Sequence, residues 1–293
     1  MPELPEVETL RRELFSAVRG RIIRSVQVKV PKMVKPLTPA KFSQQLRGKK
    51  ILDVNRRAKI LIVKLSGDNY LMIHLKLTGQ LIFIPKKLQA KSYKLIIGGH
   101  PQKGGANNLP NQFTHIIFDF SDGSKLFFND LRKFGWMRIA DKQQADKLAS
   151  EFGIEPLEKD FTLPNFNAIL KKYPNRKIKQ ILMDQSLIAG VGNIYTDESC
   201  FCAKIRPTRI VKTLKDKEIK DLYHCLPKIL KLAISKKGTS ADTYIQLDGS
   251  QGGMEPYLKV YGRKGQMCKR CKGVIERIKL NGRGTHFCRQ CQR

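Results

Sequence analysis

The feature that most constrains how this chain can fold is a set of four cysteines at its C-terminal end. Cys268 and Cys271 form one Cys-x2-Cys pair, and Cys288 and Cys291 form a second pair after sixteen intervening residues. This is the spacing of four thiolates around a structural Zn²⁺ ion, although a redox dithiol is an alternative for each pair. Four protein ligands leave no open position on the metal, so we expect one structural zinc ion without a catalytic role.

We predict that residues 259–293 form a zinc ribbon in which the residues between the two pairs make a two-stranded hairpin. Such a short segment buries little apolar surface, so metal binding has to supply much of its folding energy. Basic side chains dominate the ribbon, where Glu276 is the one acid and Arg283 lies near the predicted tip. A solvated ribbon that only stabilises the chain end is one interpretation, but the one-sided charge favours contact with DNA.

The other three cysteines, Cys200, Cys202 and Cys225, lie apart from this cluster. The total of seven is odd, and the acidic N-terminus lacks the apolar run of a signal peptide. Both observations argue against a disulfide framework. We therefore expect these three residues to be free thiols that are buried as small core residues.

The net charge narrows the class of partner. It is +31 at pH 7, which is typical of a protein that binds a densely negative partner. Nucleic acid is favoured over an anionic membrane surface, because no basic amphipathic helix with a large aromatic face stands out. No apolar run is long enough to span a membrane either. We expect a cytoplasmic monomer whose nucleic-acid binding weakens steeply with salt.

The hydrophobic pattern predicts an α+β multidomain chain. Residues 5–19 have the periodicity of an amphipathic helix, and Gly20 is the stop signal that follows. Stretches rich in branched and aromatic residues, separated by turn signals, then predict an antiparallel β-sandwich. They are residues 22–30, 51–65, 70–84 and 113–128. Between the last two, residues 85–112 are rich in glycine and proline, which predicts a long surface loop; a tolerated insertion is favoured over a functional loop.

After about residue 140 the pattern becomes helical. The candidate helices are residues 143–152, 165–172, 177–184 and 217–235. The glycine-rich turn from Ala189 to Tyr195 leads into another helix; such a helix start can hold a phosphate, or the turn can be an ordinary helix junction. We therefore predict three domains: a β-sandwich over residues 1–140, a helical domain over 141–258 and the ribbon over 259–293.

The N-terminus, Met1-Pro2-Glu3-Leu4-Pro5-Glu6, offers a reactive group. If Met1 is removed, Pro2 carries a free secondary amine, and an α-amine has a pKa of about 7.7–8.0, so part of it is neutral near pH 7. Such an amine can attack a sugar C1′ or a carbonyl while a nearby carboxylate moves protons. On these residues alone, a proline and acids that shape a helix start are the favoured interpretation.

Several ordered blocks change that preference, because together they resemble the formamidopyrimidine-DNA glycosylase and endonuclease VIII family over nearly the whole chain. The N-terminal block resembles the formamidopyrimidine branch more than the endonuclease VIII branch. The blocks are residues 2–9, Arg56-Arg57-Ala58-Lys59, His74-Leu75, Asp130 to Gly135, Gly190 to Tyr195, Val260 to Gly265 and the four cysteines.

The resemblance implies a β-sandwich, a helix-two-turn-helix domain and a zinc ribbon, with DNA in the cleft between the two main domains. It implies a bacterial base-excision repair enzyme, both DNA glycosylase and AP lyase, in which Pro2 attacks C1′ to form a Schiff base. Glu3 is then the acid/base group, Glu6 supports the site, and Lys59 and Arg283 belong to the catalytic set. β,δ-Elimination follows, and no external cofactor is needed.

The resemblance also implies DNA-binding roles. The target nucleotide is extruded from the stack, and Leu77, Arg132 and Phe134 fill the gap. Each of these has a plainer interpretation, core packing for Leu77 and Phe134 and a surface charge for Arg132. The implied phosphate contacts are Lys59, His74, Lys179, Asn193 and Arg283, and the implied cover of the flipped base is the glycine-rich loop 248–256.

Three departures from the family pattern bear on lesion preference. Leu77 stands where methionine is usual, Leu131 and Lys133 interrupt a Pro-Arg-Arg-Phe pattern, and residues 85–112 are an atypical insertion. The leading hypothesis is excision of oxidised purines, namely 8-oxoguanine and formamidopyrimidines, from double-stranded DNA. The alternatives are an endonuclease VIII-like enzyme for oxidised pyrimidines and a non-catalytic DNA-binding protein on the same scaffold.

Overall fold

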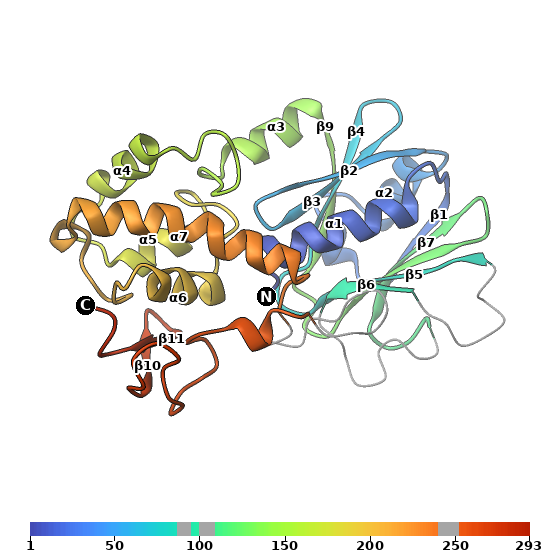
Figure 1. Ribbon diagram of the computed structural model, residues 1–293. Coiled ribbons are helices and arrows are strands. Elements are labelled where there is room, and N and C mark those ends of the chain that lie inside the picture. Colours follow the sequence, from blue (N-terminus) through green and yellow to red (C-terminus); the bar gives the residue numbers. More distant parts are fainter. Residues whose placement is uncertain (87–94, 100–108, 240–251) are drawn as a thin grey trace. The chain divides into compact units, whose positions relative to one another are not determined.

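The computed structural model describes residues 1–86, 95–99, 109–239 and 252–293. The chain divides into two compact units (Figure 1). The first comprises Met1–Ala149 with Lys237–Gly253, and the second comprises Ser150–Lys236 with Met254–Arg293. The three-domain division at residues 140 and 258 stays a prediction. In the described part of the chain, no helix is long and apolar enough to cross a membrane.

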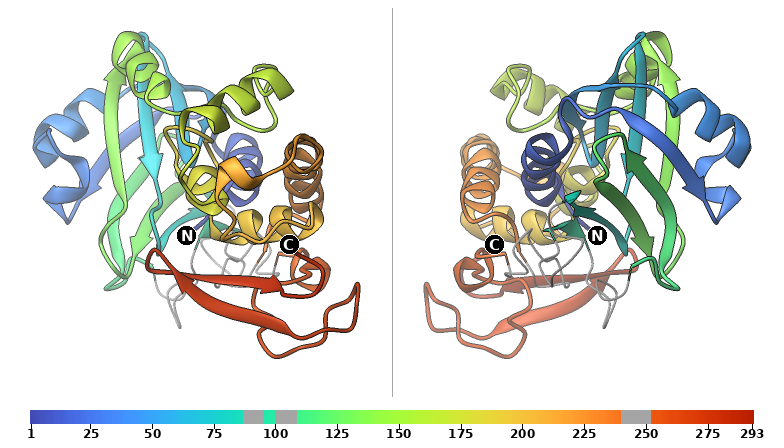
Figure 2. Two further views of the ribbon diagram at one scale, coloured as in Figure 1. Left: turned by 90° about the vertical axis from the view of Figure 1, so that its left-hand side faces the viewer. Right: turned by 90° about the vertical axis from the view of Figure 1, so that its right-hand side faces the viewer.

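The first unit is built on two antiparallel sheets, which Figure 2 shows from two directions. The five-stranded sheet has the order β1 (Ile23–Val28), β7 (Thr114–Phe120), β8 (Lys125–Asp130), β5 (Gly79–Ile84) and β6 (Leu95–Gly99). The four-stranded sheet has the order β2 (Ile51–Arg57), β3 (Ile60–Leu65), β4 (Asn69–His74) and β9 (Trp136–Asp141). Both sheets contribute side chains to one hydrophobic core. The predicted β-sandwich is confirmed.

Helices flank these sheets. Helix α1 (Leu4–Val18) buries Val7, Leu10, Leu14 and Val18 in the same core, as its periodicity predicts. Gly20 follows it with a φ of 81°, a conformation that glycine adopts without steric cost. The sequence patterns did not predict the short helix η1 (Pro31–Val34) or helix α2 (Pro39–Leu46). Helix α3 (Lys142–Ser150) follows β9 where a helix was expected.

Two sequence predictions in this unit need correction. The predicted loop 85–112 contains strand β6, which pairs with β5; residues 87–94 and 100–108 of that loop lie outside the described residues. Strand β9 was missed and pairs with β4. Buried and exposed residues do not alternate regularly along this strand, which directly follows the Asp130–Gly135 segment. Its sequence therefore lacks the clear period-2 pattern that predicts a strand.

The second unit contains helices α4 (Leu163–Lys172), α5 (Ile178–Met183), α6 (Asn193–Cys202) and α7 (Asp216–Ser235), with short helices η3 (Val211–Thr213) and η4 (Glu255–Tyr257). Helix α7 is amphipathic, and its buried face includes Ile219, Leu222, Leu226 and Leu230. The four candidate helices from the sequence correspond to α3, α4, α5 and α7 and are confirmed, with ends that differ by at most two residues.

The C-terminal ribbon has the predicted hairpin. Strands β10 (Ile275–Leu280) and β11 (Arg283–Cys288) pair in antiparallel register, with Leu280 opposite Arg283. The two-residue turn between them is Asn281-Gly282, with positive φ at both residues, which is the combination that tight hairpins favour. Arg283 therefore lies next to the tip of the hairpin, as predicted.

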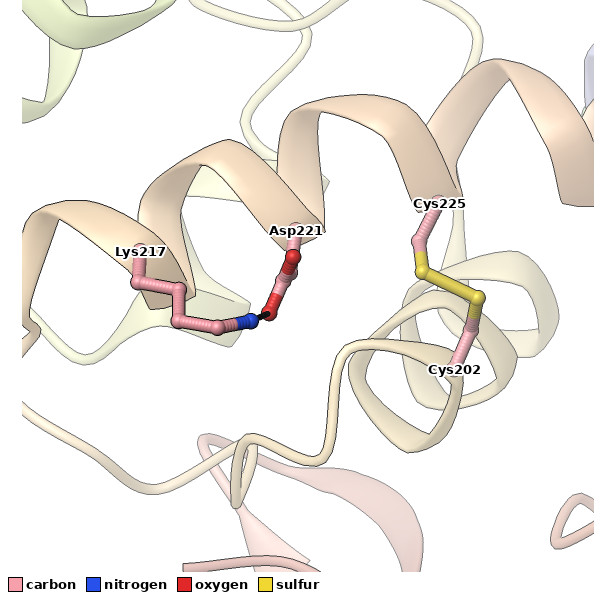
Figure 3. Close-up of a disulfide and its surroundings, with 4 residues drawn as sticks. All are labelled: Cys202, Lys217, Asp221 and Cys225. Carbon is pink, nitrogen blue, oxygen red and sulfur yellow. Dashed lines mark hydrogen bonds and ion pairs between the residues drawn. A yellow bond between two sulfur atoms is a disulfide. The ribbon is translucent and has the colours of Figure 1, made fainter.

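The prediction for the isolated cysteines is correct for one residue and wrong for two. Cys200 is a free, fully buried thiol whose pKa is raised by burial. Cys202 and Cys225, however, are joined by a disulfide between α6 and α7 (Figure 3). These two helices pack against each other and bring the two Cα atoms to 5.8 Å, a separation that a disulfide spans. An odd count of cysteines could not reveal this pairing.

Candidate functional site

The predicted nucleophile and acid/base residue lie where α1 begins, in the first unit. Glu3 is the residue before the helix and is 3 % exposed. The carboxylate of Glu6 accepts hydrogen bonds from the backbone N–H of Glu3, at 2.9 Å, and of Thr239, also at 2.9 Å. Gly238 packs so closely that a Cβ there would lie 2.8 Å from Glu6 Oε1. Glu6 therefore holds the backbone that carries Pro2 and Glu3.

Lys59 lies at the tip of the β2–β3 hairpin. The two-residue turn has a φ of 52° at Ala58, and Arg56 Nη1 donates to the Ala58 carbonyl at 3.0 Å. The Arg56 guanidinium also lies 3.5 Å from a carboxylate oxygen of Glu8 in α1. This ion pair ties the hairpin to the helix that begins beside Pro2 and Glu3. Lys59 itself is 6 % exposed, so it is not one more solvated lysine.

Glu8 is the anion at the centre of this connection. Burial by itself raises the pKa of its carboxyl group, but hydrogen bonds from Arg11 and Arg12 and the charge of Arg56 outweigh burial. The pKa of Glu8 therefore lies below its usual value, and Glu8 remains an anion near pH 7. Its sequence pattern gave it no predicted role, although Glu8 belongs to the N-terminal block, residues 2–9.

His74 ends strand β4 and is held as a neutral ring. The backbone N–H of Lys76 donates to Nδ1 at 2.9 Å, which leaves the proton on Nε2 and makes that nitrogen a donor. Burial, followed by the charges of Lys76 and Lys59, lowers the pKa of His74 to about 3. Since the charge of Lys59 acts on this ring, the fold brings these two predicted phosphate contacts near each other.

The three predicted gap-filling residues lie on two loops of the first unit. Leu77 is half-buried in the turn between β4 and β5. Arg132 and Phe134 are exposed on the segment between β8 and β9, and the Arg132 guanidinium carbon lies 4.9 Å from the centre of the Phe134 ring. Phe134 is 52 % exposed, so the core-packing interpretation does not hold for it.

The second unit carries the remaining predicted contacts. Asn193 begins α6, and its Oδ1 has no hydrogen-bond partner among the described residues. Arg283 is exposed and lines a cavity of about 260 Å³ together with Arg176 and Asn281. Loop 248–256, the predicted cover of the flipped base, lies outside the described residues up to residue 251.

Lys179, a predicted phosphate contact, lies buried in the second unit. Its side chain is 2 % exposed, and Nζ lies 2.6 Å from Asp197 Oδ1. The other oxygen of Asp197 accepts the backbone N–H of His286 at 2.7 Å. The Lys179 ammonium group thus joins α5 to α6 and, through the Gly284 carbonyl at 3.3 Å, to β11. Lys179 also lines the cavity of Arg176 and Arg283, and its role as a phosphate contact stays a prediction. Asp197 lies in α6, two residues after the Gly190–Tyr195 block, and no sequence pattern marked it as a functional residue.

The four C-terminal cysteines form a metal site. Their Sγ atoms all lie within 4.8 Å of one another. The Cys271 and Cys291 sulfur atoms lie 3.1 Å apart, so the separations bracket the roughly 3.8 Å that a tetrahedral ion with Zn–S bonds of about 2.3 Å needs. The backbone N–H of Arg270 points at Cys268 Sγ, at 3.4 Å, and supports the thiolate form. The predicted site for one structural zinc ion is confirmed.

Comparison with known proteins agrees with this architecture. The family model of the formamidopyrimidine-DNA glycosylase N-terminal domain matches residues 1–137, and the model of its H2TH (helix-two-turn-helix) domain matches residues 152–244. A zinc finger found in FPG and IleRS matches residues 265–293. The fold and the four-cysteine site thus define a zinc-finger DNA glycosylase of base-excision repair.

Full-length relatives specify the family. The chain is 38 % identical to a formamidopyrimidine-DNA glycosylase of Heliobacterium modesticaldum and 40 % identical to one of Listeria monocytogenes, with all of each chain covered. Lactococcus lactis Fpg in complex with abasic-site DNA has a TM-score of 0.85 and 35 % identity, covering 99 % of both chains. A variant of that protein with Fapy-dG DNA has a TM-score of 0.86 and 36 % identity, with full coverage of both chains. The chain belongs to the formamidopyrimidine-DNA glycosylase family.

Proposed function

We propose that this protein is a bifunctional DNA glycosylase and AP lyase that removes 8-oxoguanine and formamidopyrimidines from double-stranded DNA in the bacterial cytoplasm. The observation that carries the proposal is the buried N-terminal arrangement, in which Glu6 holds the backbone of Glu3 and α1 begins directly behind Pro2. Glu3 and Glu6 form a capping box at this helix start, and the Glu3 side chain is only 3 % exposed, so its carboxylate lies in a buried position directly behind Pro2.

The nucleophile requires removal of Met1, which is 38 % exposed. The Pro2 nitrogen then attacks C1′, the C1′–N bond to the damaged base breaks, and the base leaves with a proton. Opening of the sugar ring gives an iminium ion between Pro2 and C1′. Glu3 is the group beside Pro2 that can protonate the sugar oxygen and move protons in this step.

Strand cleavage follows from the same intermediate. The iminium ion acidifies the C2′ proton, so a base can remove it and the 3′ phosphate leaves in β-elimination. A second elimination releases the 5′ phosphate, and hydrolysis of the Schiff base frees Pro2. The four cysteines fill every coordination position of the zinc ion, so the ion contributes to the folding of the ribbon and takes no part in these steps.

DNA binding is assigned to both units separately. In the first unit Lys59 offers a cation and His74 offers a neutral Nε2–H donor, both suited to a phosphate oxygen. In the second unit Asn193 at a helix start and the exposed Arg283 offer two further donors. Leu77, Arg132 and Phe134 are the residues that occupy the space left by the extruded base.

The test uses protein whose N-terminus has been verified as Pro2. Borohydride should trap a covalent adduct with abasic duplex DNA, and a chain that retains Met1 should give none, because its Pro2 nitrogen is an amide. An adduct formed equally by both forms would overturn the assignment of Pro2. A cleavage panel with 8-oxoguanine and with oxidised pyrimidines decides the substrate class; faster cleavage of the pyrimidines would replace our proposal by an endonuclease VIII-like activity.

A further inference from the structure

We infer that Asp130 and Thr78 are positioning residues that join the two gap-filling loops into one preorganised unit. The inference rests on the proposed function, since it concerns how Leu77, Arg132 and Phe134 are held for insertion into DNA. Neither Asp130 nor Thr78 would itself touch the DNA, because they are 0 % and 6 % exposed. The residues that they hold are the exposed ones.

Both oxygens of the Asp130 carboxylate are used by the segment that follows it. Oδ1 accepts the backbone N–H of Arg132 at 3.1 Å, and Oδ2 accepts the backbone N–H of Gly135 at 2.7 Å. The carboxylate thus closes a short loop over residues 131–134. At Gly135 a Cβ would lie 3.1 Å from Oδ2 and 2.5 Å from the Phe128 ring, so this approach requires glycine.

Thr78 connects this loop to the other one. Its hydroxyl donates to Asp130 Oδ1 and accepts the backbone N–H of Arg132 at 3.0 Å. Thr78 directly follows Leu77 in a tight turn that is closed by the Gly79 N–H on the Leu75 carbonyl, at 2.9 Å. One hydroxyl therefore links the backbone beside Leu77 to the backbone of Arg132.

The position of these groups in the sheet explains why they meet. Asp130 ends β8 and Gly79 begins β5, and these two residues are partners in the register of the two strands. The loops therefore leave the sheet side by side. A buried carboxylate with three donors is costly unless every bond forms, which favours a single loop arrangement over an ensemble. Ordering the loops costs conformational entropy. If both loops are already ordered before DNA binds, the extrusion step does not have to supply that cost.

The matched pair Thr78→Val and Thr78→Ser tests the inference, because both are small and only serine keeps the hydroxyl. We expect Thr78→Val to excise 8-oxoguanine opposite cytosine about tenfold more slowly than wild type in single turnovers, which corresponds to about 1.4 kcal/mol. Thr78→Ser should stay near wild type. The loss should shrink when the lesion is mispaired, since extrusion then costs less. Borohydride trapping on abasic DNA should remain at the wild-type level.

A spectroscopic measurement keeps the test independent of catalysis. Trp136 directly follows Gly135 and is the one tryptophan of the chain. Its acrylamide quenching should increase in Thr78→Val and in Asp130→Asn, but not in Thr78→Ser. Equal excision rates and equal quenching in Thr78→Val and Thr78→Ser would overturn the inference. So would a loss of borohydride trapping in Thr78→Val that is as large as its loss of excision. A wild-type protein that neither excises nor traps would instead overturn the proposed function.

Discussion

Loss of the Cys202–Cys225 disulfide should destabilise the second unit by about 3 kcal/mol. The bond joins residues that are 23 positions apart. In the chain-entropy treatment, opening a loop of that size returns to the unfolded chain an entropy worth about 3.4 kcal/mol at 25 °C. The nearby Lys217–Asp221 ion pair cannot compensate, because Lys217 is 85 % exposed and surface pairs contribute little (Figure 3).

The assay is thermal unfolding of zinc-loaded protein under non-reducing conditions. Cys202→Ser, Cys225→Ser and the double variant should all unfold about 10 °C lower than wild type, since about 3 kcal/mol corresponds to a shift of that order in a domain of this size. The three variants should agree with one another, because either substitution alone opens the bond. Additive losses in the double variant would indicate packing effects instead of a disulfide.

A thiol titration gives the independent result that would refute the reasoning. Unfolded, metal-free wild type should show five reactive thiols, matching the five free cysteines. Seven thiols, together with unchanged melting of the double variant, would show that α6 and α7 are not cross-linked. A cavity of about 300 Å³ beside Cys202 and Cys225 lets a reductant reach the bond, so treatment with a phosphine should reproduce the shift of the variants.

Three other predictions concern the metal, a buried ion pair and the partly buried His74. Cys268→Ser should release zinc and weaken DNA binding, as followed by metal analysis and by a binding titration; full metal content would contradict the four-cysteine site. Lys179→Met should destabilise the second unit by about 3–5 kcal/mol, because it leaves Asp197 as an unpaired buried charge, and Lys179→Met with Asp197→Leu should recover much of this in denaturant unfolding. For His74 the folded pKa of about 3 lies below the unfolded value of 6.5, so its contribution to stability is present above pH 6.5 and is lost as pH falls toward 3. Between pH 7 and pH 5 that loss is about 2 kcal/mol, and His74→Gln should remove it from the pH dependence of the unfolding free energy; an unchanged slope would refute the assignment.

The elements that sequence patterns predicted are those whose signal is local. Helix α1 repeats apolar residues at helical spacing, and the spacing of the two Cys-x2-Cys pairs by itself predicts a four-cysteine metal site. Pro2, Glu3 and Lys59 were found through ordered family blocks, and their roles stay predictions. Burial then gave a physical reason to separate Lys59 from the many exposed lysines, which sequence position alone could not do.

The features that sequence patterns missed depend on contacts between distant residues. Cys202 pairs with Cys225 only because two helices pack, and Lys179 is buried where it meets Asp197 and the Gly284 carbonyl. A basic residue in a basic chain is expected at the surface, so composition alone could not reveal the burial of Lys179. Asp130 and Thr78 are 52 positions apart, and only the β5–β8 register brings them together.

Two consecutive acids of α6 explain why the ribbon belongs to the same compact unit as the helices. The carboxylate of Glu198 accepts the backbone N–H groups of Lys259, Val260 and Tyr261, each at about 2.9–3.0 Å, where the chain enters the ribbon. Burial raises the pKa of Glu198 even though these bonds oppose the shift.

Asp197 meanwhile holds β11 through the His286 N–H. The helix that begins with Asn193 is therefore attached to the ribbon at two places, one at its entry and one on the strand that begins with Arg283. Since both attachments run through buried carboxylates, the spacing between Asn193 and Arg283 is set by α6 itself and does not depend on the zinc ion alone. Zinc loss should then disorder the turns that carry the cysteines before β11 separates from α6 at the bond between His286 and Asp197.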